Sequence, residues 1–280
     1  MTSGHALSSA EIAKRAKSNL ALALACLPEA RRRDMISFYA FCRLADDIAD
    51  SATLSEEEKE TQLSHWKKCV LSSESTGHAV LDEVIELPDK YGFPRAWLAE
   101  VIDGVASDIK HTRYETFEQL QAYCYQVASV VGLVSIHIFG HKNPQAAEYA
   151  IQLGYALQMT NIIRDVGEDA LRGRIYLPVQ ELQQFEVTAT DVLQRRDSPA
   201  FQALMRFQAE RALGLYEQAL AMLPAGDWRS QKPGLMMASI YRTLLHEIQA
   251  AQFPVLNQRV SLTPVRKLWL AWKMQALGRF

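Results

Sequence analysis

Apolar residues recur at spacings of three and four along almost the whole chain. This period predicts amphipathic helices, and no convincing alternation of polar and apolar residues and no Asn-Gly turn indicates a β-hairpin. No flexible linker, low-complexity tract or fixed-period repeat divides the chain. We therefore predict an all-α protein with one domain over residues 1–280. Turn-forming residues interrupt the helical pattern near Pro28 and at residues 72–78, 91–94, 140–144, 171–178 and 223–234.

Composition adds limits to this picture. With 280 residues, of which 49% are hydrophobic and 22% charged, the chain is long enough for a sizeable core, and its net charge of -2 gives no general reason to bind nucleic acid. The four cysteines show no CxxC spacing, which favours buried thiols and a cytoplasmic protein. The longest apolar run, residues 127–140, is short and interrupted by Ser and His. We therefore expect no membrane span, and at most peripheral contact with the inner face of the membrane.

The stretch YAFCRLADDIAD, residues 39–50, places three aspartates in five positions of an otherwise apolar helix. Asp46 and Asp50 lie one turn apart on the same face, and Asp47 points away from that face. At a separation of about 6 Å and an effective dielectric of about 20, the two carboxylates repel each other by roughly 3 kcal/mol. The helix gains no stability from this pair. A single DxxxD motif is also typical of a solvated helix end, so a second observation is needed.

A second acidic stretch supplies that observation. NIIRDVGED, residues 161–169, places Asn161, Asp165 and Asp169 at i, i+4 and i+8 on one helix face. Gln158 lies near the same face one turn earlier. Arginines flank both acidic stretches: Arg43 in the first, and Arg164, Arg172 and Arg174 around the second.

Facing aspartate motifs predict a particular chemistry. Four carboxylates that meet across a helical bundle are tolerable only with cations between them. Mg²⁺ suits such a site because it binds hard oxygen ligands together with substrate phosphates, and arginines hold phosphates by paired hydrogen bonds. This donor set indicates the departure of a diphosphate leaving group, which leaves a carbocation behind. The carbocation must be kept from water, so we expect a deep apolar cavity beneath the metal site.

Residues 123–136 offer a wall for that cavity. Tyr123, Val127, Val131 and Val134 recur there at i, i+4, i+8 and i+11. Taken alone, such a stripe is equally typical of an ordinary helical core.

Four segments of the chain resemble the squalene/phytoene synthase family of head-to-head all-trans prenyl transferases. They are FYAFCRLADDIAD, YCYQVASVVG, LGYALQMTNIIRDVGEDALRGRIYLP and YRTLLHEI, and they follow the family's order across nearly the whole chain. The resemblance implies a single-domain isoprenoid-synthase helical bundle with a central apolar cavity. It also implies that two prenyl diphosphates bind in this cavity and that Mg²⁺ is the cofactor.

The resemblance also assigns roles to individual residues. The two aspartate motifs, which with Asn161 would hold Mg²⁺, are Asp46 and Asp50, and Asp165 and Asp169. Residues that would hold diphosphate oxygens or lie along the second motif helix are Tyr39, Arg43, Arg164, Gln158 and, after a one-residue shift in register, Arg259. Tyrosines near the reacting centre are Tyr176 and Tyr241. Cavity-lining positions are Tyr123, Val127 and Val131, and positions where aromatic residues commonly line the tail pocket of relatives carry Leu20 and Leu24.

The two ends of the chain bear on the substrate. Asn19, within KSNL at residues 17–20, and the late RVSLTPVRKLWLAWK resemble bacterial enzymes of the squalene and hopanoid route. We therefore expect condensation of two farnesyl diphosphates to presqualene diphosphate, with a second step to squalene or a related thirty-carbon product left open. The alternative is a phytoene synthase of carotenoid biosynthesis that uses geranylgeranyl diphosphate. NADPH use stays open, because relatives that use NADPH also lack a GxGxxG fingerprint.

Three other functions compete with these two. A class I terpene cyclase also ionises a prenyl diphosphate, but it normally carries an Asn/Ser/Glu metal motif where this chain has its second aspartate pair. A non-catalytic protein that binds prenyl diphosphates, or that assembles with an active synthase, would not need both pairs intact. A prenyl diphosphate phosphatase would release farnesol without any coupled product.

The remaining features have plainer explanations. His137 and His141 stand at i and i+4, but no Glu base accompanies them, so a structural role is favoured over a metal site. Gly132 and Gly154 lie inside helical patterns, which is typical of close helix packing or ligand approach. Residues 264–280 combine basic residues with Leu and Trp. We expect this ending to pack on the body as a helix, with peripheral membrane contact as the alternative.

Overall fold

A computed structural model of the chain describes residues 8–15 and 20–277. Within these ranges the regular structure is helical, and the β pairing is limited to an isolated bridge between Arg113 and Ile175. The all-α prediction is therefore confirmed.

The helices follow the predicted pattern of breaks, each of which contains or adjoins a helix boundary. The first nine are α1 (Ser9–Arg15), α2 (Leu20–Leu24), α3 (Glu29–Ala49), α4 (Glu56–Ser72), α5 (Ala79–Ile85), α6 (Leu87–Tyr91), α7 (Ala96–Lys110), α8 (Phe117–Cys124) and α9 (Val130–Phe139), with a π-turn at Tyr125–Ser129 between the last two. The others are α10 (Ala146–Leu171), α11 (Val179–Gln184), α12 (Ala189–Leu193), α13 (Pro199–Met222), α14 (Lys232–Ala250) and α15 (Pro264–Leu277), with 3-10 turns at Ala225–Asp227 and Pro254–Leu256.

Local chemistry sets several of these boundaries. Ser55 begins α4 with a capping box, and the Ser198 hydroxyl accepts a hydrogen bond from a backbone N–H at the start of α13. Gly92 and Gly140 end α6 and α9 with φ angles of 71° and 89°, values that favour glycine. These caps stop the helices at the loops that the sequence predicts.

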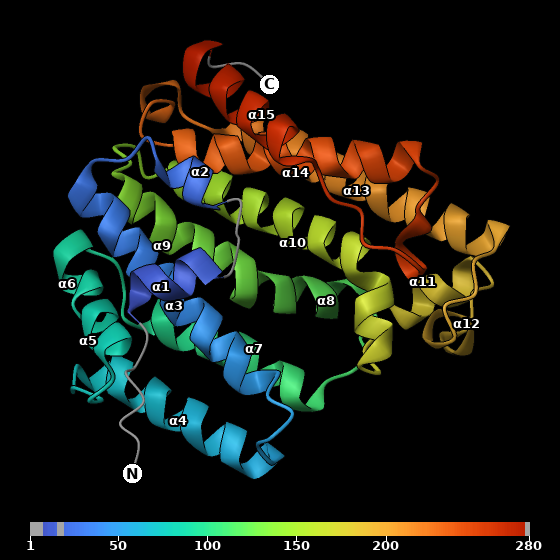
Figure 1. Ribbon diagram of the computed structural model, residues 1–280, viewed down its shortest axis with the longest axis horizontal. Helices are drawn as coiled ribbons and strands as arrows, with labels where there is room; N and C mark the ends of the chain where they lie inside the picture. The colour runs from blue at the N-terminus through green and yellow to red at the C-terminus, as the bar shows by residue number, and fades with distance from the viewer. Residues whose placement is uncertain (1–7, 16–19, 278–280) are drawn as a thin grey trace.

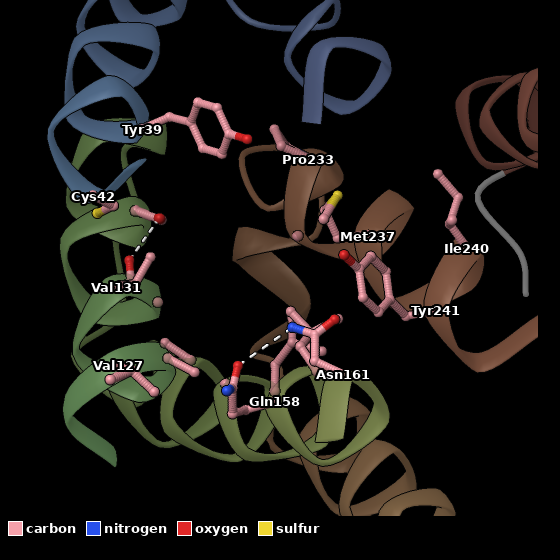
Figure 2. Close-up of a pocket in the computed structure, with 18 of the residues that line it drawn as sticks. Tyr39, Cys42, Val127, Val131, Gln158, Asn161, Pro233, Met237, Ile240 and Tyr241 are labelled. Carbon is pink, nitrogen blue, oxygen red and sulfur yellow. Dashed lines mark hydrogen bonds between the residues drawn. The ribbon is translucent and has the colours of Figure 1, made fainter. Parts of the chain in front are cut away.

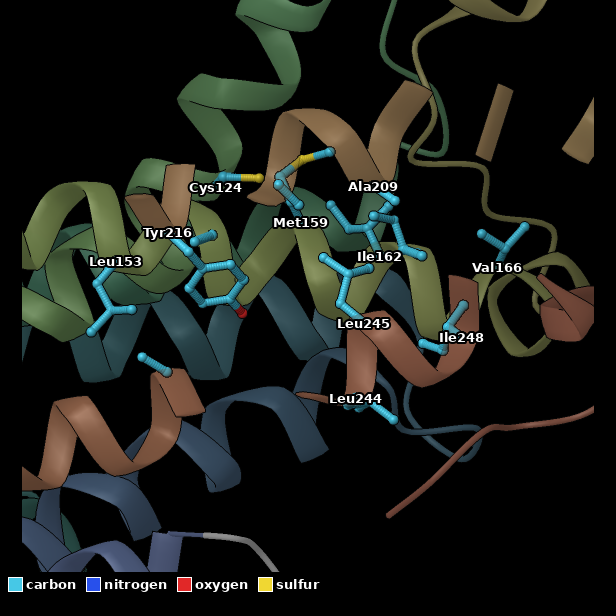
Figure 3. Packing of buried hydrophobic residues seen from close by; sticks show 14 of the residues in the cluster. Cys124, Leu153, Met159, Ile162, Val166, Ala209, Tyr216, Leu244, Leu245 and Ile248 are labelled. Carbon is cyan, nitrogen blue, oxygen red and sulfur yellow. The ribbon is translucent and has the colours of Figure 1, made fainter. Parts of the chain in front are cut away.

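The long helix α10 runs through the centre of the molecule (Figure 1). It packs against α13 and α14 on one side and against α9 and the π-turn on the other. Its side chains join those of α13 and α14 in one cluster of buried residues (Figure 3). Helices α3, α4, α5 and α7 form a second cluster together with α9. The protein is thus held together by two cores, one on each side of a central space.

Two glycines bring the central helices close together. A Cβ atom at Gly154 of α10 would lie 2.5 Å from the Cα of Ser129 in the π-turn. A Cβ atom at Gly132 of α9 would lie 2.7 Å from the carbonyl oxygen of Ala150. Real Cβ atoms do not approach this closely, so glycine is required at both positions. This confirms the close packing predicted for these two residues.

The helical stretch Phe117–Phe139 is, within the described ranges, long and apolar enough to cross a membrane by length and composition. However, 56% of its most apolar window is buried inside the protein, where it packs between the two cores. The core helix of a bundle commonly has this composition. All four cysteines are free thiols; Cys69 and Cys124 are buried as predicted, whereas Cys26 and Cys42 are only partly buried.

Candidate active site

A cavity of about 840 Å³ lies between the two cores. Its walls come from α3, the π-turn, α9, α10, α14 and the segment that leads into α15. Most of the lining residues are apolar, and the charged ones include Arg43, Arg164 and Arg259, whose part of the wall we call the polar end. This volume lies near the upper end of the range of about 300–1,000 Å³ that is usual for ligand pockets. The predicted central apolar cavity is therefore present.

Several residues predicted from the sequence line this cavity. Figure 2 shows Tyr39 of α3 and Tyr241 of α14 facing the same space from different sides, with Gln158 of α10 beneath them. Polar groups from three helices thus meet at an otherwise apolar space. The predicted residues on the wall are Tyr39, Arg43, Val127, Val131, Gln158, Asn161, Arg164, Tyr241 and Arg259.

The predicted stripe over residues 123–136 is divided by the π-turn. In a continuous α-helix Tyr123 would share a face with Val127, but a π-turn adds a residue to one turn and rotates the later residues around the helix axis. Val127 and Val131 accordingly line the cavity. Tyr123 instead points to Asp108 of α7, and Val134 is buried in the core around α3 and α7. Tyr123 and Val134 are therefore not on the cavity wall. The predicted stripe assumed one unbroken helical period, which the π-turn interrupts.

The first aspartate motif lies at the end of α3, where two arginines hold one of its members. Arg172 and Arg174 come from the loop that follows α10 and bind the two oxygens of Asp50 at 2.7 and 2.8 Å. Arg174 also donates to the backbone carbonyl of Asp108 at 3.2 Å. These contacts tie the end of α3 to the end of α10. The two motifs therefore lie at the same end of the bundle.

The second motif lies on α10 and is paired in a similar way. The Arg164 guanidinium forms two hydrogen bonds with the neighbouring Asp165 carboxylate. Arg259, from the segment before α15, approaches the same carboxylate at 3.1 Å and Glu168 at 3.6 Å. The arginine that needed a shifted register in the sequence thus reaches the second aspartate motif.

Asp46 and Asp169, one from each motif, make no side-chain hydrogen bond or ion pair with another described residue. The pKa of Asp46 rises to about 7, mainly because the surrounding walls remove hydrating water even though its edge stays exposed; nearby Arg43 acts in the opposite direction. Burial likewise raises the pKa of Asp169 to about 7, and repulsion by Asp165 adds to this shift. Both carboxylates are also repelled by Asp108. The two motifs and Asp108 therefore form one acidic region.

Asp108 is a site residue that the sequence analysis missed. It lies on α7 and accepts hydrogen bonds from the hydroxyls of Tyr123 and Tyr176, each at 2.8 Å. These two rings pack with Tyr114, with ring centroids 5.4 to 5.9 Å apart. Burial raises the pKa of Asp108, and the two tyrosine hydrogen bonds oppose this shift. Asp108 has no acidic residue three or four positions away on α7, so its spacing in the sequence gave no sign of a site.

The two tyrosines predicted near the reacting centre occupy different places. Tyr241 lies on the cavity wall, and the guanidinium carbon of Arg164 is 5.9 Å from its ring centroid. Tyr176 instead donates a hydrogen bond to Asp108 and is not among the cavity-lining residues. Burial and the charge of Asp108 raise the pKa of Tyr176, so its hydroxyl stays protonated at neutral pH.

Arg43 and the N-terminal leucines have their own environments. Arg43 lines the cavity and forms an ion pair with Asp47 at 2.7 Å, four residues further along α3. Leu24 is buried in the core with α3 and is not among the cavity-lining residues. The predictions for Asn19 and for the side chain of Leu20 fall outside the part of the chain that the structure describes.

The donor atoms of the acidic region are of the chemical type that Mg²⁺ prefers. The acidic region supplies hard oxygen ligands from both motifs, and the Oδ1 atom of Asn161 is buried without a hydrogen-bond partner. The amide nitrogen of Asn161 donates to Gln158 at 3.3 Å, which leaves Oδ1 as the free acceptor. Over residues 8–15 and 20–277, no three His, Cys, Asp or Glu side chains enclose a space for an ion. Two of the four motif carboxylates are held by arginines instead.

His137 and His141 have structural environments. Their rings meet edge to face with centroids 4.5 Å apart, and His137 Nδ1 is 3.1 Å from the carbonyl oxygen of Tyr91. Burial lowers the pKa of His137, which favours the neutral ring. These contacts are those of a packed histidine, as the absence of a neighbouring Glu base suggested.

Known proteins share this fold and this sequence pattern. Residues 13–266 match the family model described as squalene/phytoene synthase. The phytoene synthase of Arthrospira platensis is 36% identical over 262 residues, which cover 86% of this chain and 83% of the relative. The phytoene synthase of Mycobacterium tuberculosis is 36% identical over 263 residues, which cover 93% and 87%.

A crystal structure of a dehydrosqualene synthase in complex with a ligand superimposes with a TM-score of 0.85 and 26% identity, over 96% of this chain and 95% of that one. Its all-α isoprenoid-synthase fold is therefore the fold of this protein. The match to the family model covers far more than half of the chain. This chain belongs to the squalene/phytoene synthase family of prenyltransferases.

Proposed function

We propose that this prenyltransferase condenses two molecules of geranylgeranyl diphosphate head to head and converts the product to phytoene. The observation that carries the proposal is the 36% identity to proteins named phytoene synthase, over most of both chains. This favours the twenty-carbon substrate over the farnesyl diphosphate expected from the two ends of the chain. The head-to-head chemistry is the same for both substrates.

The cavity supports this reaction by its size and its polarity. A volume of about 840 Å³ gives room for long apolar chains, and the wall around Val127 and Val131 offers them apolar contact. A carbocation formed at the polar end would therefore face carbon and aromatic groups of this wall. Tyr241 presents its ring to the cavity at this end.

Arginines would bind the diphosphates. Arg43, Arg164 and Arg259 line the polar end of the cavity, and their guanidinium groups can each donate two parallel hydrogen bonds to phosphate oxygens. In the structure these donors are held by Asp47, Asp165 and Glu168. A diphosphate that enters the cavity would therefore replace these carboxylates as the partner of the arginines.

Mg²⁺ would be held by Asp46, Asp50, Asn161, Asp165 and Asp169, and when bound it supplies positive charge that stabilises the departing diphosphate. Asp46 and Asp169 have no ion pair within the described part of the chain, so their oxygens are available without breaking a contact. The Asn161 amide is oriented by Gln158. Asp108 would keep the Tyr123 and Tyr176 hydroxyls turned away from the metal ligands, because it accepts hydrogen bonds from both.

A second candidate is condensation of two farnesyl diphosphates to a thirty-carbon product. The observation that favours it is the structural likeness to a dehydrosqualene synthase, at a TM-score of 0.85 and 26% identity. Both candidates use the same motifs and differ in how far the tail reaches along the cavity. The identity of the product would show which final step takes place, loss of a proton or transfer of hydride from NADPH.

The test is incubation of the purified protein with Mg²⁺ and either prenyl diphosphate, with and without NADPH, followed by mass spectrometry. Phytoene from geranylgeranyl diphosphate, with a lower kcat/KM for farnesyl diphosphate, is the expected result. A thirty-carbon product alone would replace the proposal by the second candidate. Free prenyl alcohol would indicate a phosphatase, and a magnesium-dependent rise in Tm without turnover would indicate a binding protein.

A further inference from the structure

Helix α15 carries an apolar surface that no other described part of the protein covers. Val265, Leu268, Trp269 and Trp272 are 77%, 55%, 52% and 62% exposed. They make up half of the large hydrophobic side chains that are exposed over residues 8–15 and 20–277. Their positions i, i+3, i+4 and i+7 place them on one face of the helix. An exposed apolar patch of this kind marks an interaction surface for a membrane, a protein or a ligand.

The opposite face of α15 explains why this helix is held in place. Leu270 and Met274 lie about 140° and 180° around the helix from Val265, and both are buried in the core with α14. The predicted packing of the chain's ending on the body is therefore confirmed for this face. The exposed face is a separate feature, because burial of Leu270 and Met274 does not require tryptophans on the outside.

Basic residues of α15 flank the apolar face. Arg266 and Lys273 lie about 80–100° from Val265, on one flank of the apolar face. Helix α15 contains no Asp or Glu. Arg266 pairs with Glu247 of α14 at 3.3 Å, and Lys273 lies 5.5 Å from the Trp269 ring centroid. Tryptophan with flanking basic residues is the composition of helices that lie in the interface of an anionic membrane.

The same helix borders the cavity. Lys267 of α15 and Leu262 just before it are among the cavity-lining residues. The exposed face is therefore only one helix diameter, about 10 Å, from the cavity wall. Figure 1 shows α15 along one edge of the molecule, at the end away from α4. Such a helix can lie flat on a surface while the rest of the protein stays outside it.

We propose that the exposed face of α15 docks the protein on an anionic lipid bilayer. A second copy of the chain is a poorer occupant, because two such faces would bring Lys273 of both copies together and α15 carries no Asp or Glu to offset them. Docking places the cavity wall beside the lipid, into which an apolar product would pass. Only this transfer step rests on the proposed function, since binding to lipid does not depend on turnover.

Sedimentation of the full-length protein with phosphatidylcholine vesicles, with and without phosphatidylglycerol, tests the docking. We expect binding that requires phosphatidylglycerol and weakens with salt. Trp269→Ser/Trp272→Ser should lower partitioning by at least about tenfold, and Lys273→Gln by about fivefold. Matched controls on α4 are Leu71→Ser, where the leucine is 47% exposed, and Lys68→Gln, where the lysine is also exposed; both should bind like the wild type.

Brominated lipids locate the contact, because bromine quenches tryptophan emission only within the bilayer. The protein has five tryptophans, and the three outside α15 are half-buried. Trp269→Phe/Trp272→Phe should keep the binding and lose the quenching. Unchanged binding of the serine variant, equal binding to uncharged vesicles, or an unquenched wild type would overturn the proposal. So would a concentration-dependent dimer that only the serine variant abolishes, since a second copy would then cover the face.

Circular dichroism and Tm of each variant establish that it is folded. If the protein makes phytoene, vesicles should speed multiple turnover of the wild type and not of the serine variant. Binding without this acceleration would leave the docking intact and remove the transfer step. Absence of turnover in every variant would count against the proposed function and leave the vesicle result unaffected.

Discussion

The two ends of the cavity are built on different physical principles. At the polar end, the lining arginines pair with carboxylates that lie outside the cavity lining, and Asp46 and Asp169 of the two aspartate motifs have no partner among the described residues. The apolar wall consists of helices brought together at Gly132 and Gly154, with almost no free space at their crossing. Ion pairs can exchange partners, whereas close-packed backbones cannot. The polar end is therefore suited to bind and release charged groups, and the wall to hold a fixed shape.

This difference predicts that changes at the polar end cost activity, and that changes in the wall cost stability or alter substrate length. Four sets of substitutions test it.

The largest effect is expected at the unpaired aspartates. Asp46→Asn and Asp169→Asn should each lower kcat/KM by about 10³-fold, equal to about 4 kcal/mol, because each removes charge that acts on the leaving group. Steady-state assays measure this. The Tm of Asp46→Asn should stay close to that of the wild type because this side chain is exposed, and the Tm of Asp169→Asn should stay the same or rise because burial and repulsion by Asp165 disfavour its charged form.

The matched control is Asp103→Asn, which makes the same change at a surface carboxylate bound to Lys67 at 2.8 Å. Its rate should stay close to that of the wild type. Near-normal turnover by Asp46→Asn would remove the aspartate from the proposed site.

Substitutions in the apolar wall should lower stability, in contrast to those of the aspartates. Gly154→Ala would place a methyl group against the Ser129 backbone and should lower the free energy of unfolding by about 2–3 kcal/mol. Chemical denaturation measures this loss. Gly214→Ala, in α13, is the control, because a Cβ there meets nothing within 4 Å and should stabilise the helix by about 0.5–1 kcal/mol. Equal effects of the two changes would contradict the role given to close packing.

Arg172 and Arg174, which follow α10, are charged residues that should nevertheless contribute to stability, because they join the two cores. Arg174→Gln should lower the free energy of unfolding by about 2 kcal/mol, since this side chain is only 15% exposed and binds both Asp50 and the Asp108 carbonyl. Arg172→Gln removes a contact to the same carboxylate from a side chain that is 58% exposed, and should cost about 0.5 kcal/mol. Urea unfolding of the pair compares them. A larger loss for Arg172→Gln would show that exposure does not govern these contacts.

The smallest effect is expected on substrate length. Val131→Phe narrows the cavity and should lower the use of geranylgeranyl diphosphate relative to farnesyl diphosphate by about tenfold, because the longer tail needs more of the wall. Val131→Ala should leave this ratio unchanged or shift it the other way. Competition assays with both substrates measure the ratio. A shift in the same direction for both variants would mean that Val131 does not touch the tail.

The helical class, the breaks and the two aspartate motifs could be predicted because each has a local signal. Apolar spacing of three and four marks helices, and Gly140 marks a helix end. Asp46 with Asp50, and Asp165 with Asp169, stand out because like charges one turn apart need a reason. The match to the family model confirms the family that these motifs suggested.

Other parts of the site have no local signal. The π-turn at Tyr125–Ser129 looks like any apolar helix in the sequence, so the shift that separates Tyr123 from Val127 could not be foreseen. Asp108 has no acidic neighbour at helical spacing, and only the fold brings it to Tyr123 and Tyr176. Leu24 was assigned to the tail pocket by likeness to relatives, yet it is buried in a core.

The sequence by itself determined which residues are charged, which helices are amphipathic and which family the chain resembles, because these properties depend on residue types at short spacing. Tertiary structure alone decided which carboxylates remain unpaired, which side of the π-turn lines the cavity and which face of α15 is left exposed. Each of these depends on contacts between residues far apart in the chain. Spacing along one helix cannot encode them, because the partner across the bundle is fixed only when both cores have packed.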